Sequence, residues 1–184
     1  MEKRSINHLV ERHVLVIEQG IELIEDLSDS EYTFSRETDR GTVGTHFRHI
    51  LDFVCRFLDG LEEGRIDYNR RERDPLTETD RDHAIERFRL ICLQLQALPE
   101  EIGDCEILSH LEPGNFVEEE NAWCRTSVLR ELEFLQSHTL HHYALIAAKL
   151  SLQGIEVDEE FGVAPSTLDY WEREKAEKLS VTTR

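Results

Sequence analysis

Five of the nine histidines in this chain lie in two short clusters, at residues 45–49 and 137–142. Within the second cluster, His138 and His142 are four residues apart. On a helix this spacing places both imidazoles on one face, one turn apart, where both can bind the same ion. The two clusters therefore suggest a metal site in a helical protein, although a pair of buried, hydrogen-bonded histidines has the same spacing.

The helical period indicates which of these histidines face inward. At about 100° per residue, His142 lies inside the apolar stripe of its segment, His138 lies at the edge of that stripe, and His141 is turned away. In the first cluster the pattern favours His46, which lies nearer the main stripe than His49 does. Because a packed helix can bury a second flank, the period alone does not choose between His46 and His49.

Four segments have the three- and four-residue apolar period of helices that bury one face. They span residues 6–27, 42–63, 82–98 and 127–153. Such helices predict an all-α protein with an antiparallel four-helix bundle, in which metal sites are formed by side chains on facing helices. We expect one domain over residues 1–184.

Two further segments do not follow this period. Residues 103–125 contain the turn signal Glu-Pro-Gly-Asn at 112–115, so we expect a small β-hairpin or flap insertion across one end of the bundle, before the last bundle helix. Residues 155–184 form a C-terminal extension, in which a short helix is expected through Tyr170 and Trp171.

Composition excludes several classes of partner. The formal net charge of -18 argues against nucleic acid and against an anionic membrane surface, because both would be repelled. No segment approaches the roughly 20 apolar residues of a membrane helix, and the N-terminus does not resemble a signal peptide. The four cysteines form no CxxC pair, so we expect reduced thiols in a cytoplasmic protein.

Both histidine clusters resemble motifs of the DinB/YfiT-like superfamily. Residues 46–53 are similar to its second-helix signature, in which the ligand is the histidine directly before an apolar pair and an aspartate. Residues 138–142 resemble its last-helix signature, H-x-x-H-H, in which the first and final histidines are ligands. The resemblance spans about residues 6–154, and the flap and tail are similar to an uncharacterised bacterial subgroup.

The resemblance implies a four-helix bundle with His49, His138 and His142 as metal ligands, and it places His46 and His141 in the second rank. Three neutral imidazoles leave one or more positions on a divalent ion open for water or substrate, which is the arrangement of catalytic sites. Zinc, nickel or ferrous iron would each accept such ligands.

Relatives of this kind include metal-dependent hydrolases and transferases that act with low-molecular-weight thiols. The resemblance therefore implies an enzyme acting on a small molecule, with a non-catalytic, metal-stabilised ligand-binding bundle as the alternative. A carboxylate is expected to orient one ligand histidine through its other nitrogen. Asp52 and Glu133 are the candidates, with simple surface charge as the other interpretation of each. A homodimer is left open.

Residues 68–74 concentrate cations in an acidic chain, with arginines at positions 70, 71 and 73. Two interpretations remain: a rim that binds the anionic group of a substrate or thiol, and a solvated loop that pairs with the acidic surface.

Metal binding should also depend on pH, because protons and metal compete for the same nitrogens. Histidine pKa values near about 6.5 predict that affinity weakens progressively below neutrality.

Overall fold

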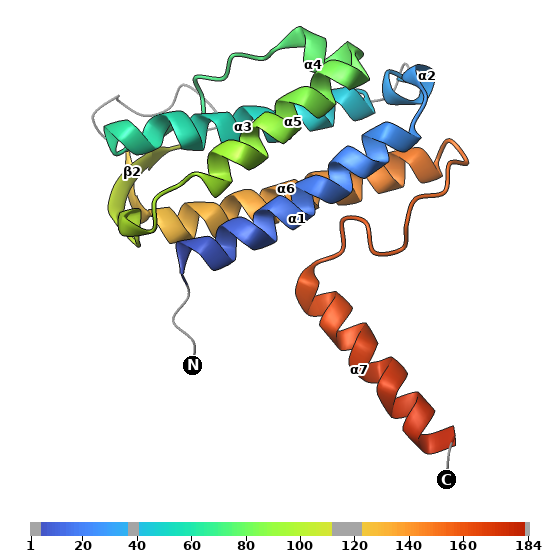
Figure 1. Ribbon diagram of the computed structural model, residues 1–184. Helices are drawn as coiled ribbons and strands as arrows, with labels where there is room; N and C mark the ends of the chain where they lie inside the picture. Colours follow the sequence, from blue (N-terminus) through green and yellow to red (C-terminus); the bar gives the residue numbers. More distant parts are fainter. Residues whose placement is uncertain (1–4, 37–40, 112–122, 183–184) are drawn as a thin grey trace.

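The computed structural model describes residues 5–36, 41–111 and 123–182 of the chain. It is mostly helical, with a small three-stranded sheet. The four long helices are α1 (Ile6–Asp26), α3 (Val43–Glu63), α5 (Arg81–Gln96) and α6 (Val128–Ser151), each within two residues of the bounds expected from the apolar period. Helix α1 contacts α5 and α6, and α3 contacts the same two helices (Figure 1).

Capping residues set where the histidine-bearing helices begin. The Thr42 side chain accepts from the backbone N–H of Thr45, and the Thr45 hydroxyl reciprocates with the Thr42 N–H, which forms a capping box at the start of α3. Gly64, at φ 66°, ends this helix in the left-handed conformation that glycine adopts without steric cost. Ser127 caps α6 through the N–H of Arg130.

The structure also contains short elements that the apolar period did not predict. They are α2 (Asp29–Tyr32), α4 (Pro75–Thr79), the 3₁₀ turn η1 (Glu100–Ile102) and strand β1 (Arg65–Asp67). Each has five residues or fewer, which is too short for a hydrophobic period to show. Their signals are local ones, such as the capping box at Ser28 before α2 and the Asp74 cap followed by Pro75 before α4.

The sheet contains the flap expected before α6. Strand β2 (Glu106–His110) pairs antiparallel with β3 (Cys124–Ser127), and it pairs parallel with β1 on its other edge. The expected turn at residues 112–115 lies outside the described residues. Because β1 directly follows Gly64, the sheet joins the C-terminal end of α3 to the N-terminal end of α6.

Aromatic side chains fill the centre of the core. Phe47 of α3 is fully buried and meets Phe88 of α5 and Tyr143 of α6 edge-on, at ring-centroid distances of 5.7 and 5.9 Å. Gly20 of α1 lies against Tyr143, so closely that a Cβ at position 20 would lie 2.0 Å from the tyrosine hydroxyl. Helix α6, which carries three of the clustered histidines, is therefore packed tightly against α1 and α3.

The C-terminal extension returns to the core and then leaves it. Phe161 stacks on Tyr143, with ring centroids 4.6 Å apart, and Gly162 packs against the backbone of α6 at φ +73°. Helix α7 (Pro165–Thr182) then projects away from the other helices (Figure 1), and it is longer than the short helix expected there. Among the helices of the described residues, none combines the length and apolarity that crossing a membrane requires.

Candidate metal centre

Three imidazoles from two helices converge in the structure. His49 comes from α3, whereas His138 and His142 come from successive turns of α6. One nitrogen from each ring lies within 4.8 Å of the other two, and the ring centroids are 4.6 to 5.1 Å apart. The structure thus brings together the same three residues that the resemblance implies as ligands.

Burial keeps these three imidazoles neutral. Desolvation, which is the largest cause in each case, lowers the pKa of His49 and of His142 to about 3 and the pKa of His138 to about 4. The neighbouring histidines and Arg71 add smaller effects of the same sign. The expected pKa near 6.5 is therefore wrong for this cluster, and its lone pairs remain available well below neutral pH.

The environment of His138 tests whether the cluster suits an ion. Its Nε2 atom is buried and has no hydrogen-bond partner among the described residues, which is costly for a polar atom. Phe53 and Phe134 pack against the ring, with centroids 4.3 and 5.6 Å away. Their side chains have no polar atom that could form a hydrogen bond with this nitrogen. A divalent ion would use the lone pair of this nitrogen, so the residues present fit a metal.

His46 lies beside the cluster and contacts one of its members. Its Nδ1 atom is 2.9 Å from Nδ1 of His142, so one of the two nitrogens donates and the other accepts. If His142 donates, its Nε2 keeps the lone pair that a metal needs. The pattern-based choice of His46 therefore identified a residue of the site, but one that is not part of the group of three. His141 is exposed and is not part of that group, although its ring meets the ring of His142 edge-on, with centroids 5.4 Å apart.

The two carboxylates expected to orient a ligand lie in different surroundings. Asp52 is buried, and its carboxylate accepts from Arg48 and from the backbone N–H of Arg73. Glu133 lines a surface pocket near the start of α1, together with Ser5 and other residues but without any of the three clustered histidines. Among the described residues, the hydrogen-bond partners of the clustered imidazoles are instead His46, described above, and an arginine.

That arginine is Arg71, which the sequence placed only in a cationic loop. Its Nη1 donates to Nδ1 of His49 at 3.0 Å, and its guanidinium lies 5.5 Å from the centroid of the Phe53 ring. No sequence motif marks this contact, because it depends on how the loop after β1 folds back over α3.

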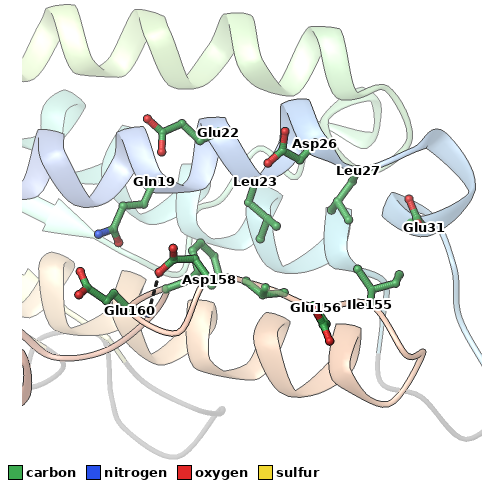
Figure 2. Close-up of a pocket in the computed structure, with 12 residues that line it drawn as sticks. Gln19, Glu22, Leu23, Asp26, Leu27, Glu31, Ile155, Glu156, Asp158 and Glu160 are labelled. Carbon is green, nitrogen blue, oxygen red and sulfur yellow. Dashed lines mark hydrogen bonds between the residues drawn. The ribbon is translucent and has the colours of Figure 1, made fainter.

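Several pockets of the described residues lie outside the cluster itself. One, of about 360 Å³, adjoins the cluster at His46 and is lined by three apolar residues together with Arg36, Lys149 and Gln153. Another, of about 450 Å³, lies between α1, α2 and residues 155–161 (Figure 2). Figure 2 shows Leu23 of α1 and Leu27, directly after that helix, directed toward residues 155–161 and surrounded by six carboxylates. None of the histidines lines this second pocket.

Comparisons with known proteins identify the family. A family model described as the DinB superfamily matches residues 16–146. The protein named FK506-binding protein 5, from Rhizopus delemar, is 31% identical over 108 residues, which are 57% of this chain and 27% of the fungal protein. No solved structure matches the chain. Because the family match covers well over half of the chain and both histidine clusters, the chain belongs to the DinB superfamily.

Proposed function

We propose that this protein is a metal-dependent enzyme in which His49, His138 and His142 hold one divalent ion. The observation that carries the proposal is the convergence of three neutral imidazoles, which no carboxylate or thiolate joins among the described residues. Structural zinc sites usually have four protein ligands, whereas catalytic sites keep a position open. We further propose one domain over residues 1–184, built as an antiparallel four-helix bundle of α1, α3, α5 and α6.

The reaction class follows from what such a centre supplies. A bound ion would acidify a water molecule toward about pH 7 or hold a thiolate, which suits a hydrolase or a transferase that uses a low-molecular-weight thiol. Within the chain, His46 fixes the ring of His142 through Nδ1, and the rings of Phe53 and Phe134 keep water away from one side of His138. The pocket beside His46 offers space for a small-molecule substrate.

Metal content tests the proposal. Protein purified without a histidine tag should bind about one equivalent of zinc, nickel or ferrous iron per chain, since these ions accept imidazole ligands. His138→Ala and His142→Ala should each abolish this binding, because two imidazoles hold the ion far less tightly than three. His141→Ala is the matched control, because it removes an exposed imidazole from the same helix and should leave the metal content unchanged.

Stoichiometric metal in both single variants would contradict the assignment. A second measurement separates an enzyme from a metal-stabilised binding module: azide added to cobalt-loaded protein should change the visible absorption spectrum, because an open coordination position accepts it. An unchanged spectrum would indicate a closed shell and a structural ion.

A further inference from the structure

We infer that Arg71 binds the anionic group of the substrate or thiol that reacts at the histidine cluster. The inference rests on the proposed metal-dependent function and adds the chemical class of its ligand: a small molecule that carries a carboxylate or similar anion close to its reacting atom.

Arg71 lies beside the cluster and has an unused donor. Its Nη1 donates to His49 Nδ1, and the face of its guanidinium lies over Phe53, which also packs against His138. Its Nε atom is buried and has no hydrogen-bond partner among the described residues. Arginine has five N–H donors in a planar fork, the geometry that matches a carboxylate or phosphate.

The loop around Arg71 is held in place at both ends. On one side, buried Tyr68 stacks on Phe53, with centroids 5.0 Å apart, and its hydroxyl donates to Glu131 at 2.7 Å. On the other side, the backbone N–H of Arg73 donates to Asp52 at 3.2 Å. Arg73 adopts a φ of 55°, a conformation uncommon for residues other than glycine and often retained at functional sites. These contacts fix the path of the loop that carries Arg71 before any ligand arrives.

A metal ion removes the acceptor that Arg71 uses. The guanidinium can only donate, so His49 Nδ1 must offer it a lone pair. If Nδ1 binds the ion, that lone pair is used. If Nε2 binds the ion, the neutral ring carries its proton on Nδ1. In either case Arg71 loses its partner on His49 and needs another acceptor.

The local charge favours an anion as that acceptor. Three neutral ligands leave the full charge of a divalent ion in place, and Arg71 adds a further positive charge beside it. The carboxylate of Asp52, whose charge acts on Arg71, already accepts from Arg48 and from the Arg73 backbone. This local excess of cations contrasts with the net charge of -18 of the whole chain. An incoming carboxylate would reduce this excess of positive charge and could accept from the N–H donors of the guanidinium.

The test compares two thiols that differ in one charge. β-Mercaptopropionate and its amide have the same shape, and both offer a thiol to the metal. Their affinities are measured from the absorption spectrum of cobalt-loaded protein, without any catalytic assay. The unsubstituted protein should prefer the carboxylate by about tenfold or more, as expected for a hydrogen-bonded charge pair. Arg71→Gln should weaken this preference strongly, leaving only the part due to the charge of the ion, while the affinity for the amide stays unchanged.

Arg70→Gln is the matched control, because Arg70 is an exposed arginine of the same loop and its loss should leave the preference intact. Arg71→Lys should restore part of the preference, since a point charge replaces the fork. Equal affinities for the two thiols in the unsubstituted protein, or an undiminished preference in Arg71→Gln, would overturn the anion site alone. Failure of the unsubstituted protein to bind cobalt would instead overturn the metal centre on which the inference rests.

Discussion

His46 and His142 share one hydrogen bond, and this bond decides which nitrogen of His142 faces the centre of the cluster. With a proton on His142 Nδ1, the nitrogen lone pair of the ring is on Nε2, which lies on the side away from His46. Burial lowers the pKa of His46, so this residue remains neutral at physiological pH and its Nδ1 can accept this bond. In many metal sites a carboxylate or carbonyl has this orienting role. Here another imidazole takes it, which adds no negative charge to the site.

The two histidines of α3 should therefore differ in their effect on metal binding. His49→Ala removes a ligand and should lower the affinity by far more than about 100-fold. His46→Ala removes only an orienting partner, a change that typically costs about 10- to 100-fold. Competition with a chromophoric chelator measures both values. Equal losses, or a larger loss for His46→Ala, would show that His46 is itself a ligand.

Sequence motifs were sufficient to select the three clustered histidines, but not their neighbours. His138 and His142 follow from helical spacing, and the choice of His49 came from the family resemblance against the apolar period. The contact between Arg71 and His49 was not predictable in this way. It depends on a loop whose path is set by a backbone hydrogen bond to Asp52 and by the left-handed conformation at Arg73.

At the scale of elements, the long helices were predictable because each buries one continuous stripe, whereas the sheet was predictable only in part. Strand β1 has three residues and pairs with β2, which lies about forty positions further along the chain. Such non-local pairing leaves no local pattern in a short segment. The positions of α1 and α6 relative to each other also depend on one small residue, Gly20, which faces Tyr143.

Gly20→Ala should destabilise the protein by about 1–3 kcal/mol, as overpacked cores usually do. Alanine is intrinsically the better helix residue, by about 1 kcal/mol. The new Cβ, however, would lie 2.0 Å from the hydroxyl and 2.7 Å from Cζ of a fully buried Tyr143, which has little room to move. Urea denaturation measures the change in the free energy of unfolding.

Two further variants separate this clash from other effects. Glu18→Ala changes an exposed residue of the same helix and should have little effect on stability. Adding Tyr143→Phe to Gly20→Ala removes the closest atom of the clash and should recover part of the loss. A double variant that is no more stable than Gly20→Ala would contradict the proposed contact.

Across the whole molecule, the burial of the clustered histidines links stability to pH. In the unfolded chain these side chains regain the ordinary histidine pKa of about 6.5, whereas in the folded chain the pKa values are about 3 to 4. At pH values between the folded and the unfolded pKa, the unfolded chain binds more protons than the native protein does. The contribution to stability is therefore complete above about pH 6.5 and is lost progressively as the pH falls toward the folded values.

The same pKa shifts lower the pH at which the ion should be lost, compared with the pH expected for ordinary histidines. A native cluster that stays neutral below pH 6 still offers lone pairs to the ion at pH values where free histidines are protonated. A free ion at about 100 times its dissociation constant stabilises the native state by about 2.7 kcal/mol. We expect the melting temperature to rise on adding zinc by a similar amount at about pH 7.5 and about pH 5.5, and this rise to disappear only as the pH approaches about 4.

Thermal melts of metal-free protein with and without excess zinc measure this difference at each pH, and His138→Ala, treated identically, should show no zinc-dependent rise. The metal-free protein should remain folded at neutral pH, because its aromatic core is independent of the ion. A zinc effect already lost between about pH 7 and 6 would mean that the histidines titrate near their usual value of about 6.5. The cluster would then be more open to water in the native state than the aromatic side chains packed against His138 indicate.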